Sequence, residues 1–255
     1  MIETSATSMV SSLQCLGIRR GDVVSVVGAG GKTTLVYRLA GEACAAGLRV
    51  LVTTTTHMGT LPEAATGPLL VEEEGCGTAA VVAALAEAGR ATLLGRRLRH
   101  DKLEGVAPGR VDELCASADL TLVEADGARG RSLKVPASHE PVLPRLTSLV
   151  VVVAALDVLG EPLTEERIHR LELVSAASGT TVGEAVDEDT IVSCLRYARG
   201  YPSRLRSGTR AAVFLNTVED AERRGAALRI ARRVVPPYGL VAAGSASGEA
   251  VRMWP

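Results

Sequence analysis

Short apolar runs alternate with longer segments of helical periodicity along most of this chain. The runs are rich in Val, Leu and Thr, and several of them, such as "SLVVVVAAL", are apolar without alternation. A strand that helices cover on both faces is typically apolar in this continuous way. We therefore expect buried strands at 22–27, 49–54, 119–124, 148–154, 210–216 and 238–243, with candidate edge strands at 69–71 and 92–94.

Amphipathic segments between these runs predict helices, at 32–46, 78–88, 111–117, 164–177, 189–199 and 218–234. The fourth begins with "LTEER", so we expect Thr164 to cap it and the following glutamates to favour its positive end. Strands that alternate with helices predict an α/β fold with a mostly parallel sheet. The segment 55–107 is less regular, and we interpret it as a candidate substrate-facing insertion in a single domain of residues 1–255.

Composition narrows the class of protein. The chain has 255 residues, of which 47% are hydrophobic, so it is long enough to bury a full core. It has 28 basic and 29 acidic residues, which gives no overall attraction to nucleic acid or to an anionic membrane, and only 2% of its residues are aromatic. Its longest apolar run, 149–156, is far shorter than the roughly 20 residues of a membrane span. We expect a cytoplasmic protein without a nucleic-acid or membrane partner.

The strongest local motif is "VVGAGGKTTL" at 26–35, a glycine turn between a predicted strand and a predicted helix. Such a turn directs backbone N–H groups and a helix N-terminus towards one point, which favours a phosphate. The P-loop spacing G-x-x-x-x-G-K-[ST] would place glycine at position 26, where this chain has Val26. A dinucleotide-binding loop is disfavoured, because Thr33 replaces its third glycine and no acid follows the next strand. The alternative that stays open is a glycine turn with an incidental lysine.

Each residue of this loop has an expected role in binding a nucleotide. Lys32 would reach the β- and γ-phosphates, and the Thr33 hydroxyl would ligate Mg²⁺. The remaining nucleotide contacts are expected from Gly28, Ala29, Gly30, Gly31 and Thr34. The cofactors that this pattern implies are Mg²⁺ and either ATP or GTP.

A second motif, "LTLVEADGARG", supplies the acid that a P-loop needs at the end of another strand. We favour Asp126 as the carboxylate on the metal side, with Glu124 as the rival. Basic residues that follow this strand are candidates for stabilising charge on transferred phosphoryl groups. They are Arg129, Arg131 and Lys134, and we count Arg129 and Lys134 with Lys32, Asp126 and Glu124 as candidate catalytic residues.

Polar residues near other predicted strand ends suggest further contacts. The strand at 49–54 continues into "TTTTHM", so Thr55, Thr56 or His57 are candidates to orient water or substrate, although threonine is also an ordinary strand residue. Lys102 in "DKLEGV" is a further candidate cation, and His139 lies in a stiff turn between two prolines.

Base recognition is ambiguous. GTPases read guanine with N-K-x-D, and here "VFLNTVED" keeps Asn216 but has Thr217 and Glu219 at the lysine and aspartate positions. The last predicted strand continues into "AGSASG", where Ser245 and Ala246 resemble the S-A element that closes over guanine. These residues favour guanine over adenine only slightly, and ordinary polar residues at strand ends remain an alternative.

Several of these motifs together resemble the YqeC family, described as selenium cofactor biosynthesis or selenium-dependent molybdenum hydroxylase accessory proteins. The resemblance rests on "VVGAGGKTT", "VLVTTTTHM", "DKLEGV", "ALDVLGEPL" and "FLNTVED", and above all on "EADGARGRSLKVPASHEPV". It implies a P-loop NTPase-like three-layer sandwich that acts in maturation of a molybdenum hydroxylase or its cofactor, with the hydroxylase or its assembly machinery as partner. Alternatives are a P-loop kinase for a small molecule and a non-catalytic nucleotide-dependent switch.

Overall fold

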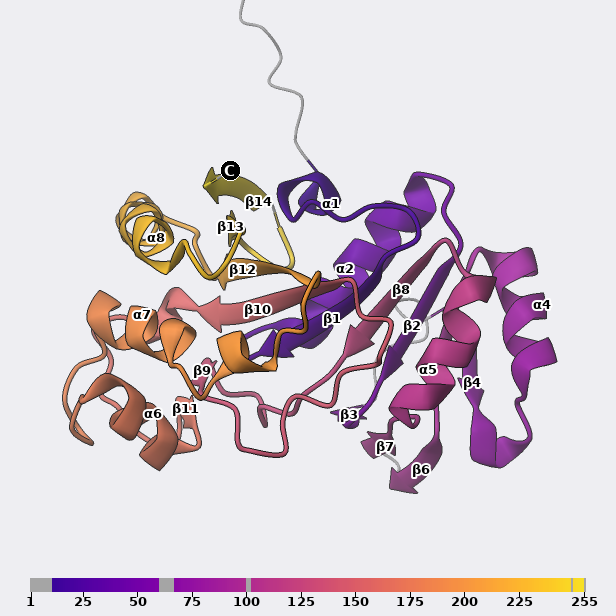
Figure 1. Ribbon diagram of the computed structural model, residues 1–255, viewed down its shortest axis with the longest axis horizontal. Helices are drawn as coiled ribbons and strands as arrows, with labels where there is room; N and C mark the ends of the chain where they lie inside the picture. The colour runs from indigo at the N-terminus through magenta and orange to yellow at the C-terminus, as the bar shows by residue number, and fades with distance from the viewer. Residues whose placement is uncertain (1–10, 60–66, 100–101, 249, 255) are drawn as a thin grey trace, which may run out of the picture.

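A nine-stranded sheet forms the centre of the computed structural model, which describes residues 11–59, 67–99, 102–248 and 250–254. Its strands are β1 (Val23–Gly28), β2 (Val50–Thr54), β4 (Leu69–Val71), β5 (Arg90–Leu94), β8 (Leu120–Glu124), β10 (Leu149–Ala155), β12 (Arg210–Asn216), β13 (Leu240–Gly244) and β14 (Ala250–Trp254). Their spatial order is β14-β13-β12-β10-β1-β8-β2-β5-β4 (Figure 1). Neighbours pair in parallel, except for the antiparallel pair β13–β14. The predicted α/β fold with a mostly parallel sheet is confirmed.

Helices cover both faces of the sheet. Those described are α1 (Ser12–Cys15), α2 (Lys32–Ala45), α4 (Thr78–Ala88), α5 (Pro108–Leu114), α6 (Leu171–Ser178), α7 (Glu188–Arg196) and α8 (Ala221–Val234). Successive side chains of a strand point to opposite faces. On β1, accordingly, Val24 and Val26 pack with α1 and α2, whereas Val23 and Val27 belong to the core that includes α4, α5, α7 and α8. The architecture is therefore a three-layer sandwich.

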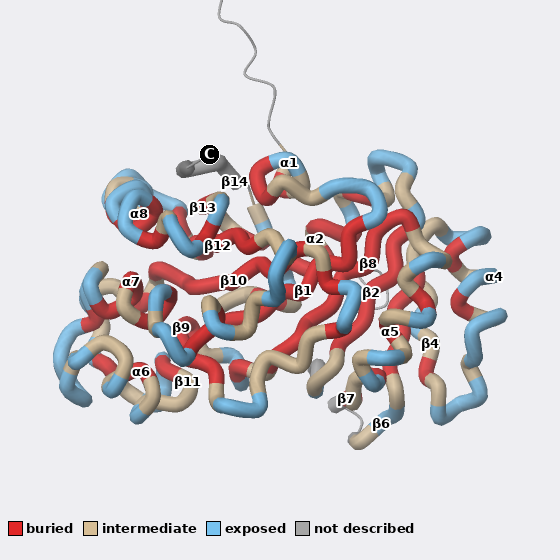
Figure 2. The backbone as a smooth tube through the Cα atoms, viewed as in Figure 1, coloured by how far each residue is buried: buried red, intermediate tan, exposed pale blue. Residues whose placement is uncertain are grey.

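The central strands are buried on both faces, which explains their continuous apolar sequences. All seven residues of β10 are buried, as are all residues of β1, β2 and β8. Figure 2 shows these strands buried, whereas the outer turns of helices such as α4 and α8 are exposed. Within the described residues, no helix is both long and apolar enough to cross a bilayer.

One predicted helix is wrong over its first half. Residues Thr164–Arg170 do not begin a helix, because Arg167 and Ile168 donate backbone hydrogen bonds to the Thr164 carbonyl in a turn. Ile168 then enters a short strand, β11 (Ile168–His169), which pairs in parallel with β9 (Leu133–Lys134). The apolar side chain of Ile168 is buried in the core beside Leu133, and helix α6 starts only after this pairing ends.

Other helix boundaries shift by a few residues for local reasons. Helix α8 begins at Ala221 rather than at 218, since the Asp220 side chain accepts from the Arg223 amide and caps the helix. Helix α5 begins earlier than predicted, with Pro108 at its first position. The remaining starts and ends agree with the predicted elements to within three residues.

The segment 55–107 contributes to two sheets. Strands β4 and β5, with α4 between them, extend the main sheet. Strands β3 (His57–Gly59), β6 (Arg96–Arg99) and β7 (Lys102–Glu104) form a separate antiparallel sheet in the order β3-β7-β6. Figure 1 shows this small sheet beyond the carboxyl ends of β2 and β8, at the edge where the glycine loop also lies.

Candidate functional site

The glycine loop joins β1 to α2 in a conformation that only glycine adopts without strain. Gly28, Gly30 and Gly31 have φ angles of 98°, 81° and 107°. A Cβ atom on Gly28 would lie 2.1 Å from the Val153 carbonyl oxygen, and one on Gly31 would lie 2.3 Å from Nδ2 of Asn216. The loop therefore packs against β10 and β12, and it does so with Val26 in place of the first glycine of the P-loop pattern.

Backbone amides of this loop are free to bind an anion. The first amide of the loop to donate along α2 is that of Leu35, which bonds to the Gly31 carbonyl at 2.9 Å. In the part of the chain that the structure describes, the five preceding amides, from Gly30 to Thr34, have no acceptor. Unpaired N–H groups at a helix N-terminus, together with the helix dipole, form an anion site.

Lys32 follows the glycine loop, and its side chain bonds to groups of the protein. Its ammonium donates to the Gly28 carbonyl at 2.9 Å, and it lies 3.3 Å from Oδ1 of Asp126 and 3.6 Å from Oε1 of Glu124. The side chain is only 4% exposed. A phosphate bound at the loop would offer this buried cation a stronger partner than a neutral carbonyl.

Glu124 is the carboxylate that contacts the predicted metal hydroxyl. Thr33 Oγ1 donates to Glu124 Oε2 at 2.6 Å. The geometry follows from strand alternation, because Leu120 and Leu122 of β8 pack against α2 and Glu124 continues on the same face. Burial raises the pKa of Glu124, against the lowering effects of Lys32 and of the Thr33 hydrogen bond.

Asp126 lies beneath the loop rather than in the cleft. Its carboxylate accepts from the Gly28 amide at 3.2 and 3.1 Å and from the Tyr201 hydroxyl at 2.7 Å, and it lies 3.0 Å from Nζ of Lys134. The residue is 1% exposed. Its oxygens are thus occupied by the loop and its supports, and this position favours Glu124 over Asp126 for the metal side, the reverse of the preference drawn from sequence.

Lys134 is likewise a supporting residue in this geometry. It comes from β9, its side chain is 0% exposed, and it donates to the Gly127 carbonyl at 2.7 Å and to Glu140 at 2.9 Å. Glu140 also pairs with Arg170 at 3.0 Å. A continuous series of ion pairs therefore runs beneath the cleft from the glycine loop to Arg170, a residue that sequence reasoning missed. Its position could be recognised only once β11 was known to pair with β9.

The cleft above these residues has a volume of about 730 Å³. One wall is the glycine loop with Lys32 and Glu124, and another is formed by residues Arg129, Arg131, His169 and Arg170. Arg129 adopts a positive φ of 51° at the turn after β8 and is exposed. Thr34 also lines the cleft. The structure thus brings Arg129 and Arg131, but not Lys134, to the cleft surface.

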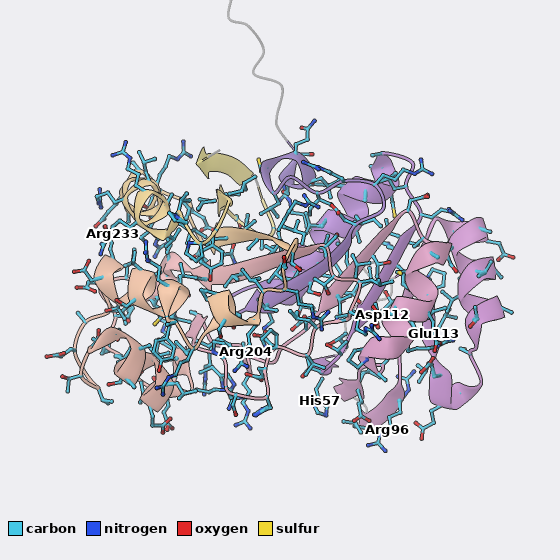
Figure 3. The ribbon with its side chains drawn as sticks, in the orientation of Figure 1. His57, Arg96, Asp112, Glu113, Arg204 and Arg233 are labelled. Carbon is cyan, nitrogen blue, oxygen red and sulfur yellow. The ribbon has the colours of Figure 1, made fainter. Side chains whose placement is uncertain are left out.

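Threonines at the end of β2 divide into structural and cleft-facing residues. Thr54 and Thr55 donate to the carbonyls of Glu124 and Val142, both at 2.7 Å, which holds the strand end in place. Thr56 and His57 line the cleft and also a neighbouring pocket of about 320 Å³. Figure 3 shows His57 at the rim formed by the small sheet, where it is exposed.

Asn216 connects the glycine loop to the end of β13. Its Nδ2 donates to the Gly30 carbonyl at 2.7 Å, and its Oδ1 accepts from the Ala246 amide at 2.7 Å. Thr217, at the lysine position of the guanine motif, has a positive φ of 59° and accepts from the Asp157 amide. Ser245 is half-buried, and its hydroxyl forms a hydrogen bond with that of Ser247. Asn216 is therefore a bridge between loops, and base contacts remain a prediction for Ser245.

Comparisons with known proteins agree on one family. A family model described as YqeC protein matches residues 24–172. A protein of Escherichia coli (strain K12) called uncharacterized protein YqeC is 32% identical over 208 residues, which cover 80% of this chain and 79% of that protein. The chain belongs to the YqeC family. The chain also has a weak structural similarity to the signal recognition particle receptor FtsY from Elizabethkingia anophelis, with a TM-score of 0.41 at 16% identity. The match covers 88% of this chain and 58% of that chain.

Two of the site residues predicted from this YqeC-family sequence are not found at the cleft. His139 is exposed in the turn before Pro141 and does not line the cleft. The structure does not describe the side chain of Lys102, so its role stays a prediction. Within the described residues, no group of three or more His, Cys, Asp or Glu side chains is arranged to hold a metal by itself.

We expect ionisation of the Glu140 carboxyl to make the free energy of unfolding depend on pH. Lys134 and Arg170 outweigh the effect of burial and lower the pKa of Glu140 from 4.5 to about 2. A carboxyl with a lower pKa in the folded state stabilises fully above the unfolded value and loses that contribution as the pH falls towards 2. We expect Glu140→Gln to lower the free energy of unfolding by about 2 kcal/mol at pH 7.

Urea unfolding of wild type and variant at pH 7 and pH 3 tests this expectation. The difference should shrink at pH 3, where Glu140 is protonated in the unfolded chain. The exposed Glu165→Gln serves as the control and should show little difference at either pH. A Glu140→Gln effect that stays equal at both values would contradict the assigned charge pairing.

Proposed function

We propose that this chain binds a nucleoside triphosphate with Mg²⁺ at the glycine loop and hydrolyses it. The observation that carries the proposal is the set of five amides from Gly30 to Thr34 without acceptors, placed beside Lys32. That arrangement matches a polyphosphate, since it combines directed N–H donors, a helix N-terminus and a buried cation. The cleft of about 730 Å³ has room for a ligand beyond the loop itself.

The residues beside the loop fit a magnesium ion. Mg²⁺ prefers oxygen ligands, usually one or two protein groups together with water and phosphate oxygens. The Thr33 hydroxyl and the Glu124 carboxylate, in contact at 2.6 Å, supply such oxygens next to the phosphate site. When bound there, the ion would neutralise charge on the phosphate oxygens.

The chain's own groups have distinct tasks in this proposal. Lys32 exchanges the Gly28 carbonyl for a phosphate oxygen and stabilises the charge that develops during hydrolysis. Arg129, which is exposed and lines the same cleft, would add a second cation. Asp126 and Lys134 hold the loop and the turn after β8 in place from below.

Replacement of Glu124 tests the metal assignment. Glu124→Gln removes the charge while keeping the shape, and we expect the apparent Mg²⁺ affinity in nucleotide hydrolysis to fall by about 10- to 100-fold. Titration of Mg²⁺ at saturating nucleotide measures the change. Asp126→Asn is the comparison, because Asp126 does not contact Thr33. A larger loss of Mg²⁺ affinity in that variant would assign the metal side to Asp126 instead.

We propose that the hydrolysis serves maturation of a selenium-dependent molybdenum hydroxylase or of its cofactor, in the cytoplasm. Membership in the YqeC family supports this role, as the resemblance of the sequence implied. We further propose a single domain in which the small sheet β3-β7-β6 faces the client or substrate. Separate titrations with ATP and GTP in the presence of Mg²⁺, followed by assays of released phosphate, test the nucleotide step. Absence of binding to both nucleotides would overturn it.

Phosphoryl transfer to a small molecule is the second candidate function. The arginine wall of the cleft favours it, since hydrolysis alone does not require Arg131 and Arg170. The two functions differ in their product. A phosphorylated small molecule indicates a kinase, whereas free phosphate as the sole product indicates a hydrolase.

A further inference from the structure

The arginine wall of the cleft is built from segments other than the glycine loop. Arg129 and Arg131 come from the turn after β8, whereas His169 and Arg170 come from β11 and the start of α6. The two segments are joined by the β9–β11 pairing and by a hydrogen bond from Arg131 to the Glu166 carbonyl at 2.8 Å. A fixed framework therefore presents these basic side chains to the cleft.

Arg170 has donor capacity that the protein does not use. A guanidinium group has five N–H donors. Its Nη2 pairs with Glu140 at 3.0 Å, while its Nε is buried and has no acceptor among the described residues. The residue lies at the N-cap of α6 with φ of 62°, and its side chain is 26% exposed in the cleft wall. Unsatisfied donors on a charged group are costly unless a ligand supplies acceptors.

The charges of this wall are not balanced by protein. Two carboxylates line the cleft, Glu124 beside Lys32 and Glu140 beside Arg170. With the buried series included, five cations (Lys32, Lys134, Arg129, Arg131 and Arg170) meet three carboxylates (Glu124, Asp126 and Glu140), so two positive charges remain. Glu124 and Asp126 balance Lys32 and Lys134, so the excess charge lies with the three arginines. Burial and the neighbouring cations lower the pKa of His169 to about 4, so this ring is neutral at pH 7 and offers a hydrogen bond without adding charge.

The two walls are also separate binding positions. Between Lys32 and Arg170 lie three charged groups in series, Asp126, Lys134 and Glu140, each joined to the next at about 3 Å. Phosphates that sit on the amides of the glycine loop therefore leave the Arg170 end of the cleft for another group. A surplus of two charges matches a phosphate dianion, which guanidinium groups bind in forked geometry.

We propose that Arg170 and Arg131, with His169 and Arg129, bind the phosphate group of a second, small-molecule substrate that occupies the cleft together with the nucleotide. The inference rests on the proposed nucleotide site, and it names the chemical class of the other substrate. This substrate would lie between the arginine wall and the γ-phosphate end of the nucleotide.

Inorganic phosphate is the probe for this site. The glycine loop is first saturated with Mg²⁺ and a non-hydrolysable triphosphate analogue, and phosphate is then titrated by calorimetry. We expect phosphate to bind the filled protein, and Arg170→Ala to weaken that binding about 10- to 100-fold while nucleotide affinity changes less than about twofold. Arg131→Ala is a second variant, which leaves the α6 N-cap intact. Arg167→Ala, whose side chain pairs with Asp157 and does not line the cleft, is the matched control.

Each outcome separates the two proposals. Phosphate binding that the analogue abolishes, or that both arginine variants retain at wild-type strength, overturns the second-substrate site. Equal losses of phosphate and nucleotide affinity in Arg170→Ala assign this arginine to the nucleotide and also overturn it. In Lys32→Ala, nucleotide binding should be weakened and phosphate binding retained. Unchanged nucleotide affinity in that variant would instead overturn the proposed function.

Discussion

Replacing Lys32 with alanine is expected to reduce nucleotide hydrolysis by at least about 100-fold and to weaken nucleotide binding. The ammonium is buried and bonds to the carbonyl of Gly28 at the start of the glycine loop, and removing one preorganised group of this kind commonly costs about 100- to 1,000-fold in rate. Released phosphate measured at saturating Mg²⁺ gives the rate, and nucleotide titration gives the affinity. Thermal unfolding of the same samples shows whether the variant remains folded.

A second substitution on helix α2 tests whether the effect is specific to Lys32. Arg38 pairs with Glu42 at 2.8 Å on α2 and does not line the cleft. Arg38→Ala should therefore leave hydrolysis and nucleotide affinity close to wild type. Wild-type affinity in Lys32→Ala would refute the assignment of this loop as a phosphate site, whatever the activity of the protein is found to be.

Replacing Asp126 with alanine is expected to destabilise the fold more than any other change within the ion-pair series. The carboxylate is buried and pairs with Lys134 at 3.0 Å and Lys32 at 3.3 Å, so its removal leaves two buried cations short of a partner. Breaking a buried pair in this way typically costs about 3–5 kcal/mol. The Gly28 amide and the Tyr201 hydroxyl lose their acceptor as well. Urea unfolding at pH 7 measures the total.

Tyr201→Phe separates the charge from the hydrogen bond. This variant removes one hydroxyl that donates to Asp126 but leaves every ion pair in place. We expect it to cost about 1 kcal/mol, the usual net value of a buried hydrogen bond. If Asp126→Ala cost no more than Tyr201→Phe, Asp126 would not be the electrostatic support of the glycine loop.

Much of the fold could be predicted because the buried strands are short and continuously apolar. The runs that became β1, β8 and β10 have no polar face, since both faces are covered, and the pattern reports that directly. The start of α6 could not be found in this way. The segment around Ile168 pairs with Leu133, which lies 35 residues earlier in the chain. The local hydrophobic pattern cannot indicate a partner that is so distant in sequence.

The sequence indicates which residues gather around the glycine loop, but only part of how they are arranged. The glycines, Lys32 and Thr33 were recognisable from their spacing alone. Parity cannot decide between Glu124 and Asp126, because both have the parity of Leu120 and Leu122. The choice depends on β8 ending at Glu124, after which the chain turns and Asp126 bonds to the glycine loop. Lys134 was expected at the phosphates because it is basic and near in sequence, but it lies fully buried in ion pairs.

The Asn216 side chain separates the part of the proposed nucleotide site near the glycine loop from the part that would contact the base. Both polar atoms of its amide bond to backbone groups of two different loops, so Asn216 sets the spacing between the glycine loop and the segment after β13. Backbone partners do not depend on which side chains those loops carry. Among the residues after Gly244, Ala246 is buried in the core and is constrained by packing. The half-buried Ser245 and the exposed Ser247 can be changed without breaking this bridge, so the proposed base contacts can be varied separately from the glycine loop.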